Sequence, residues 1–186
     1  MENGTIWKTR LHIELMNGSI RLSRDFYTRD VLEVAPDLPG KILVLKLTDG
    51  SVIKFKITEV EAYRGSEDKA CHASKGRTSR TEIMYHEGGK LYMYLIYGMY
   101  WMLNIVAGGD NNPQAVLIRG VEGFSGPGKL TKSLGIDKSF YGEDLVVSDR
   151  IWIEDAGLIC SIKNSPRIGI DYAGAYWKSR PWRYYL

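Results

Sequence analysis

The sequence predicts a single α/β domain of the α+β type, in which β-hairpins and short helices share one core. Its 186 residues are 44% hydrophobic, which is sufficient for one domain with a sizeable interior. Two apolar runs separated by Asp49-Gly50 predict one hairpin, because Asp-Gly is a strong signal for a tight turn. Aromatic residues that alternate with Leu, Met and Ile predict a second hairpin over 91–109, with its turn at Tyr97-Gly98.

The domain is expected to span residues 1–186, with residues 1–18 as a loosely attached N-terminal segment. Charged residues interrupt the first 15 positions, so the continuous apolar segment of a secretion signal is missing, and we expect a cytoplasmic protein. The two cysteines, Cys71 and Cys160, lack CxxC spacing. They therefore favour reduced thiols over a disulfide framework or a zinc site.

The first predicted elements are a short helix and the strands of the Asp-Gly hairpin. Thr28 is placed to cap a helix that ends near Pro36 and Gly40, since proline and glycine disfavour its continuation. The strands are expected over 41–48 and 51–60. They should form the first hairpin of the sheet.

The second of these strands carries acidic residues where a buried face is expected. Over 53–58 the odd-numbered residues Ile53, Phe55 and Ile57 are apolar, and the even-numbered residues are polar. If the strand stays regular, the buried face also carries Glu59, Glu61 and Tyr63. Carboxylates are seldom buried without a partner, which indicates a chemical role. The alternative is a strand that frays or bulges and leaves both glutamates in solvent.

A third strand is predicted over 114–121 and is apolar on both faces, which is typical of a central strand. It nevertheless contains Arg119, and either Glu59 or Glu61 would neutralise this charge. Opposite charges that reach one interior position are typical of a pocket. Residues 125–129, Ser-Gly-Pro-Gly-Lys, then lead into a short helix whose free amides could hold a phosphate, with a plain helix cap as the alternative.

The run at 91–109 is uncharged and nearly long enough to cross a membrane, but it contains four tyrosines, an asparagine and a central glycine. A hairpin is the better interpretation, and Tyr97 at its tip should either pack on another element or enter a partner. The net charge of +3 is concentrated in 161–186, where five basic residues interleave with aromatic ones. This mixture is typical of nucleic-acid surfaces, although many globular proteins end in a similar segment.

Several motifs follow one another along residues 20–185: Glu59-Val-Glu-Ala-Tyr63, Glu67-Asp68, His72, Leu91-Tyr-Met-Tyr-Leu-Ile-Tyr-Gly-Met-Tyr100, Asn104, Val116-Leu-Ile-Arg119, Gly142-Glu-Asp-Leu145, Arg167-Ile-Gly-Ile170 and Arg183-Tyr-Tyr185. In this order they resemble the alkyladenine DNA glycosylase family, the 3-methyladenine DNA glycosylases of mammalian type, here as a bacterial member. The resemblance implies a curved, mainly antiparallel sheet with short surrounding helices and a protruding hairpin, similar to the formyltransferase C-terminal-domain-like fold.

The same resemblance implies a DNA repair glycosylase that flips damaged purines out of duplex DNA and hydrolyses the N-glycosidic bond, leaving an abasic site. Its expected substrates are 3-methyladenine, 7-methylguanine, hypoxanthine and ethenoadenine. No motif places a lysine as a Schiff-base nucleophile, so we expect no lyase activity. We further expect a monomer with no cofactor, metal, membrane or obligate protein partner, located in the cytoplasm and at the nucleoid if bacterial.

Carried over by position, the resemblance implies that Glu61 is the general base that activates water. Arg119 and the backbone carbonyl of Ile168 would hold that water. Burial would raise the pKa of Glu61 and the arginine would lower it. We expect the arginine to dominate, because general-base catalysis requires an ionised carboxylate at neutral pH.

The resemblance also implies a pocket in which Tyr63, His72 and Tyr94 enclose the flipped base and Asn104 excludes guanine by crowding its exocyclic amino group. Tyr97 would fill the vacated position in the duplex. The hairpin places Tyr94 and Asn104 on one face only if its paired residue numbers sum to an even number.

Contacts with the DNA backbone are expected from Arg77, Arg80, Met99, Tyr100 and Lys129. Two other functions are compatible with parts of this pattern. One is a nucleic-acid binding module of the same fold that has lost catalysis. The other is a carboxylate-based hydrolase of soluble nucleosides, which would have no use for a tyrosine at a hairpin tip.

Overall fold

The 12-residue strand β3 (Val52–Tyr63) lies at the centre of the sheet in the computed structural model, which describes residues 18–186. Its first half pairs with β2 (Ile42–Lys46) and its second half with β6 (Gln114–Val121) and β10 (Arg183–Tyr185). The remaining strands are β1 (Ile20–Arg21), β4 (Leu91–Ile96), β5 (Tyr100–Ala107), β7 (Phe124–Ser125), β8 (Ile151–Asp155) and β9 (Lys163–Ser165).

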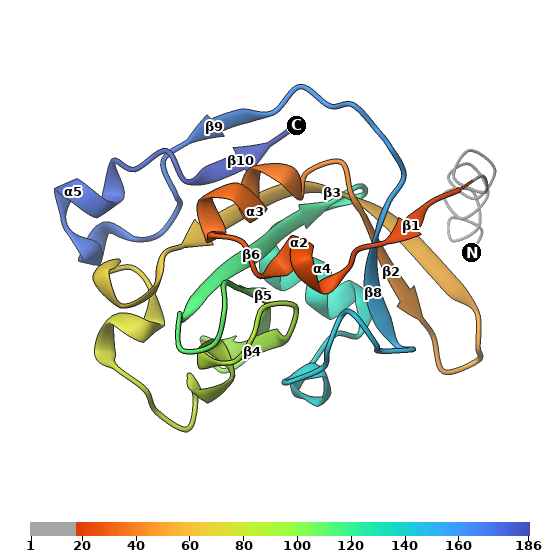
Figure 1. Ribbon diagram of the computed structural model, residues 1–186, viewed down its shortest axis with the longest axis horizontal. Helices are drawn as coiled ribbons and strands as arrows, with labels where there is room; N and C mark the ends of the chain where they lie inside the picture. The colour runs from red at the N-terminus through yellow and green to blue at the C-terminus, as the bar shows by residue number, and fades with distance from the viewer. Residues whose placement is uncertain (1–17) are drawn as a thin grey trace.

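Within residues 18–186 every strand pairing is antiparallel, and the path β1-β8-β2-β3-β6-β5-β4 stays open instead of closing into a barrel (Figure 1). The prediction of one mixed α/β domain with a mainly antiparallel sheet is confirmed. The likeness to the formyltransferase domain stays a prediction. The N-terminal segment predicted over 1–18 lies outside the described residues, apart from Gly18.

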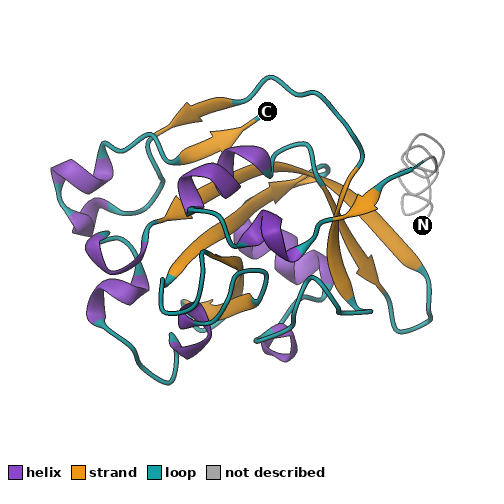
Figure 2. Cartoon of the chain, viewed as in Figure 1, coloured by secondary structure: helices purple, strands orange, loops and turns teal. Residues whose placement is uncertain are grey.

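Short helices surround the sheet (Figure 2). The α-helices are α2 (Arg24–Tyr27), α3 (Val31–Asp37), α4 (Pro127–Leu134) and α5 (Ala175–Lys178), and the 3₁₀ turns are η1 (Gly65–Glu67), η2 (His72–Lys75), η3 (Glu82–Tyr85), η4 (Lys138–Phe140) and η5 (Asp171–Ala173). The helix predicted to begin at Thr28 is α3, and its cap is Asp30, whose carboxylate accepts the Leu32 N–H at 2.9 Å. The Thr28 prediction is wrong because Thr28 terminates α2.

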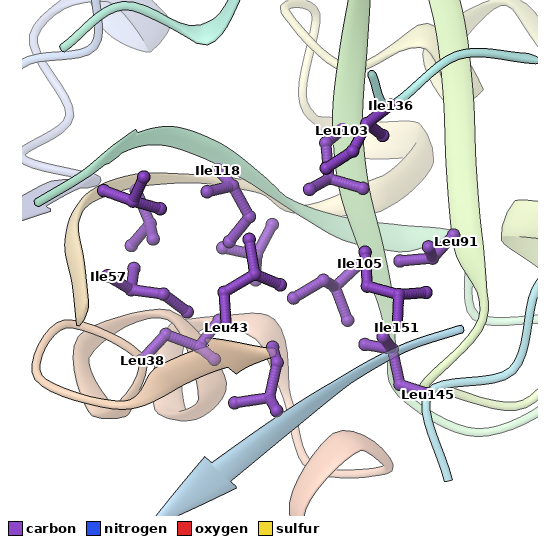
Figure 3. Close-up of a cluster of buried hydrophobic side chains, with 14 of the residues drawn as sticks. Leu38, Leu43, Ile57, Leu91, Leu103, Ile105, Ile118, Ile136, Leu145 and Ile151 are labelled. Carbon is purple, nitrogen blue, oxygen red and sulfur yellow. The ribbon is translucent and has the colours of Figure 1, made fainter. Parts of the chain in front are cut away.

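The main hydrophobic core lies between the sheet and helices α3 and α4. Figure 3 labels ten of its aliphatic side chains, which come from the strands and from the loops around them: Leu38, Leu43, Ile57, Leu91, Leu103, Ile105, Ile118, Ile136, Leu145 and Ile151. Each of them is at most 2% exposed. Burial of such aliphatic side chains contributes about 1.5–3 kcal/mol each, so this cluster supplies most of the driving force that holds the strands together.

A β-bulge interrupts β3 between Ile57 and Val60. Ile57 lies in the main core, and after the bulge Val60 and Ala62 do so as well. The extra residue changes the alternation of the strand, which moves Glu61 to the opposite face. The prediction that Glu61 shares the face of Ile57 is therefore wrong. The bulge that the alternative named is confirmed, but its expected consequence is wrong, because Glu61 is 0% exposed and not in solvent.

The uncharged run forms the hairpin of β4 and β5. The predicted turn at Tyr97-Gly98 is confirmed, with the Met99 N–H donating to the Ile96 carbonyl at 3.2 Å. Both central residues adopt positive φ angles, 52° for Tyr97 and 68° for Gly98, which is uncommon for an aromatic residue. None of the helices in the described part of the chain is both long and apolar enough to cross a bilayer.

The basic, aromatic C-terminal segment covers the second face of β3. It runs through β9, η5 and α5 and returns as β10, which lies beside β3 (Figure 1). Much of its positive charge is already paired: Arg183 contacts Glu59, Lys178 contacts Asp171, and Arg167 is buried. The segment thus contributes to the fold, while a role in binding nucleic acid stays a prediction.

Candidate active site

Glu61 lies on the face of β3 that the C-terminal segment covers. One carboxylate oxygen, Oε1, accepts the backbone N–H of Ile168 at 2.7 Å, and Oε2 accepts the Tyr63 hydroxyl at 2.9 Å. Nη1 of Arg119, from β6, lies 3.5 Å from Oε2. The structure therefore brings Glu61, Arg119 and Ile168 together as predicted. It is the Ile168 N–H that contacts the carboxylate, while a water-holding role for the Ile168 carbonyl stays a prediction.

A second carboxylate shares the arginine. Nε of Arg119 donates to Glu59 at 3.0 Å, and Nη1 of Arg183 donates to the same Glu59 oxygen at 3.2 Å. Arg119 thus bridges both glutamates, and the predicted pairing of its charge is confirmed. The sequence analysis named Arg183 in a motif but gave it no role at the site, because its position opposite Glu61 in the register depends on the return of β10 to β3.

Burial controls the protonation of Glu61. Loss of solvent raises the pKa of Glu61 above its ordinary value, and this effect exceeds the opposing effects of Arg119 and of the hydrogen bonds from Ile168 and Tyr63. The expectation that the arginine dominates is therefore wrong. A carboxylate with a raised pKa accepts a proton more readily than an ordinary glutamate once it is ionised, which suits a general base.

An aromatic cavity lies next to this carboxylate. Tyr63, His72, Tyr94 and Asn104, the four predicted pocket residues, all line it. Its volume of about 40 Å³ has room for a few waters and is far below the roughly 300–1,000 Å³ of a typical ligand pocket. The four residues are therefore assembled, but the cavity is nearly closed.

Two rings account for this closure. The rings of His72 and Tyr94 meet edge to face, with centroids 4.6 Å apart and planes inclined by 75°. A base stacked between two parallel rings needs a spacing of about 7 Å, twice the roughly 3.4 Å of stacked bases in DNA. The predicted enclosure of a base thus requires these side chains to separate and rotate.

The imidazole of His72 is neutral in this environment. Burial, followed by the nearby charges of Arg80 and Lys75, lowers the pKa of His72 to about 4. Nδ1 lies 2.8 Å from the Tyr92 hydroxyl, a buried group that was not singled out from the sequence. His72 therefore carries no charge near neutral pH.

The hairpin register places Asn104 in the same pocket. Tyr94 pairs with Met102 and Tyr92 with Asn104, so the paired numbers have an even sum and the condition for a shared face is met. The Asn104 amide donates to the backbone carbonyls of Tyr92 and Met102 at 3.2 and 3.1 Å. These bonds hold the side chain in one orientation at the pocket wall.

A buried ion pair connects the C-terminal segment to the loop that follows β3. Two nitrogens of Arg167 contact the two carboxylate oxygens of Asp68 at 2.5 and 2.9 Å, and both side chains are 0% exposed. Asp68 also accepts the backbone N–H groups of Arg64 and Ala70, and Arg167 donates to the Ala62 carbonyl. Ile168 follows Arg167 directly, so this pair positions the N–H that bonds Glu61.

The residues predicted to contact DNA fall into three groups, at the hairpin tip, in a groove beside it and in the loop near the pocket. Tyr97 and Met99 project from the hairpin tip, 84% and 63% exposed. Tyr100 and Lys129 line a groove of about 440 Å³ between the hairpin and α4. Arg77 is bonded to Glu82 at 2.5 and 2.8 Å, and Arg80 contacts the pocket residue His72. Contact of any of these residues with DNA stays a prediction.

A family model and several similar proteins relate this chain to the same kind of enzyme, a DNA glycosylase that acts on methylated purines. The model of the methylpurine-DNA glycosylase family matches residues 25–126 and 122–186. Similar proteins, whose names identify them provisionally as 3-methyladenine DNA glycosylases, occur in Methanocella arvoryzae (46% identical over 184 residues, 88% of this chain and 91% of the relative) and Psychrobacter cryohalolentis (43% over 178 residues, 80% and 84%). A third, from Desulfitobacterium hafniense, is 42% identical over 194 residues, 89% of this chain and 95% of the relative.

Replacing Asp68 by Ala should lower the free energy of unfolding by about 3–5 kcal/mol, because it leaves the charge of Arg167 buried and unpaired. Urea unfolding of both proteins measures this difference. Glu67→Ala is the matched control, since Glu67 is 60% exposed and its ion pair with Arg64 should contribute less than about 1 kcal/mol. Equal losses in the two variants would contradict the importance assigned to the buried pair.

Proposed function

The chain belongs to the methylpurine-DNA glycosylase family, and from this we propose that it removes alkylated and deaminated purines from duplex DNA by hydrolysis of the N-glycosidic bond. The proposed substrates are 3-methyladenine, 7-methylguanine, hypoxanthine and ethenoadenine, and the product is an abasic site in an uncut strand. The observation that carries the proposal is the buried Glu61 beside Arg119, next to a cavity lined by aromatic residues.

In the proposed reaction, Glu61 accepts a proton from water while the water attacks C1′ of the deoxyribose. The departing base leaves a sugar with oxocarbenium character, which a nearby carboxylate also stabilises. Each oxygen of Glu61 receives one hydrogen bond and keeps a second lone pair, so the carboxylate can still bind water. Arg119 offsets the negative charge of the carboxylate in its buried position.

Base flipping requires a replacement for the extruded nucleotide. Unstacking costs a few kcal/mol, and stacking of Tyr97 against the neighbouring bases would return about 1–3 kcal/mol. The Tyr97 side chain is almost fully exposed at the hairpin tip, which supports this role. Separation of His72 and Tyr94 would then admit the base to the pocket.

The groove beside the hairpin supports binding of the DNA backbone. Lys129 and Lys132 line it, and both side chains are exposed. The Thr131 hydroxyl of α4 donates to the Trp101 carbonyl of β5 at 2.8 Å, which connects α4 to the hairpin. The hairpin and the two lysines would therefore engage a duplex as one unit.

A non-catalytic binding module explains the site less well. Such a module has no use for a buried carboxylate with a raised pKa, an arrangement that is typical of catalytic groups. A hydrolase of free nucleosides, in turn, gives no role to Tyr97. The following experiments separate these possibilities.

Replacing Glu61 by Gln should reduce the rate of base release from duplex oligonucleotides by about 10²–10⁴-fold, because the general base is lost. Release of each of the four proposed bases under single-turnover conditions measures the effect. The variant should remain folded, since the substitution removes a charge whose burial is unfavourable. Glu122→Gln, at a partly exposed glutamate that pairs with Lys56, controls for the change in net charge. Unchanged release in the Glu61 variant would refute the mechanism.

Replacing Tyr97 by Ser should reduce hypoxanthine release from duplex DNA by about tenfold or more and largely spare a single-stranded substrate. A single strand has no stack to refill, so it serves as the internal control. Because Tyr97 is 84% exposed, its replacement should leave folding intact, and thermal unfolding verifies this. Equal losses on both substrates would contradict the proposed role of the tyrosine.

The pH dependence of base release should reflect the protonation of Glu61. The rate should fall as the pH decreases through the pKa of this group, with a midpoint above 4.5, because burial raises the pKa in the folded protein. Arg119→Met should move the midpoint to still higher pH, since the arginine lowers the pKa of Glu61. A rate profile of single-turnover release for both proteins provides the measurement, and a shift in the opposite direction would contradict this electrostatic assignment.

A further inference from the structure

Arg80 lies at the wall of the aromatic pocket. Its Nη2 is 3.1 Å from Nε2 and 3.2 Å from Nδ1 of His72, and its Nε donates to the Tyr92 hydroxyl at 3.3 Å. The centre of its guanidinium group lies 5.4 Å from the ring centroid of Tyr94. Arg80 thus contacts two residues that line the cavity and faces a third.

Among residues 18–186, Arg80 forms no ion pair with a carboxylate, whereas Arg77, three residues before it, is bonded to Glu82 through two nitrogens. The Arg80 side chain is exposed to solvent, and its contacts with His72 and Tyr92 hold the guanidinium group against residues that line the pocket. Its charge is, after burial, the second cause of the lowered pKa of His72. Arg80 therefore places an unpaired cation beside a neutral aromatic site.

We propose that Arg80 determines specificity among damaged bases by disfavouring those that carry a positive charge relative to those that are neutral. This inference rests on the proposed glycosylase function. It concerns the relative rates of two substrate classes and does not require that either class be rejected.

The chemistry of the bases explains the expected direction. Alkylation at N3 or N7 of a purine nucleoside leaves a fixed positive charge, whereas hypoxanthine is neutral. A cationic base in the pocket would be repelled by Arg80, and it would compete with Arg80 for the electron-rich face of Tyr94. A neutral purine instead offers ring-nitrogen and carbonyl acceptors to the guanidinium donors. The charge of Arg80 thus disfavours cationic bases in the pocket and favours neutral ones.

The test compares release of 7-methylguanine and hypoxanthine from otherwise identical duplexes by the wild type, Arg80→Gln and Arg80→Lys. Removal of the charge in Arg80→Gln should raise the kcat/KM ratio of 7-methylguanine to hypoxanthine about tenfold. Arg80→Lys keeps the charge and should keep the ratio within about threefold of the wild type. Measurement at about pH 6.5 keeps the 7-methylguanine nucleoside cationic, and His72 stays neutral in every variant because burial, the largest cause of its lowered pKa, is retained.

Arg77→Gln is the matched control, because it removes the same charge from an exposed position of the same loop, where the side chain is bonded to Glu82. It should leave the ratio unchanged. An unchanged ratio in Arg80→Gln, or a parallel loss on both substrates of the kind a phosphate contact predicts, would overturn the inference and leave the proposed function intact. Failure of the wild type to release either base would overturn the proposed function itself.

Discussion

The arrangement of the site depends on the buried pair of Asp68 and Arg167. The pair connects the loop after β3 to the C-terminal segment. Each carboxylate oxygen of Asp68 accepts two hydrogen bonds, one from a backbone N–H and one from Arg167. Because Ile168 follows Arg167, the same tether places a backbone N–H on Glu61. The guanidinium also lies between the rings of Tyr63 and Trp182, at 4.8 and 5.0 Å from their centroids, so aromatic packing and charge pairing restrain it together. These contacts therefore hold the C-terminal segment at Arg167 and Ile168 against β3 and the loop that follows it.

Two arginines give the site opposite electrostatic features on its two sides. Arg119 forms ion pairs with both Glu59 and Glu61, so its charge is balanced by carboxylates. It also reduces the rise in the pKa of Glu61 that burial causes. Arg80 has no such partner in the described part of the chain, and it contacts residues that line the aromatic cavity. Two arginines, Arg119 and Arg183, thus match the two carboxylates on the Glu61 side, whereas the positive charge on the pocket side is unmatched. In the proposed reaction, the ionised Glu61 would stabilise the cationic sugar, and Arg80 would act on the departing base.

The features that local chemistry determines could be predicted from the sequence, and those that depend on distant packing could not. Both hairpin turns follow from residues adjacent in the chain, and the pairing of Arg119 follows from its position on an apolar strand. The sequence left open whether β3 stays regular or bulges, because the choice depends on how β6 aligns with β3. The burial of Arg167 was missed for a similar reason, since a basic residue in a basic segment gives no sign of a partner 99 positions away. The effect of burial on Glu61 likewise depends on the segment that covers it.

The bulge has a consequence for how this chain can change. Before it, β3 presents a single apolar face to the core, and after it the two faces have separate tasks, with Val60 in the core and Glu61 in the site. Deletion of one residue between Ile57 and Val60 would exchange these tasks, so that a carboxylate would enter the hydrophobic core and an aliphatic side chain would replace the proposed base. Substitutions along β3 alter one side chain at a time, but a change in length there alters every position that follows. Families built on this strand should therefore diverge by replacement at the site and by insertion elsewhere, with the spacing from the bulge to Glu61 held constant.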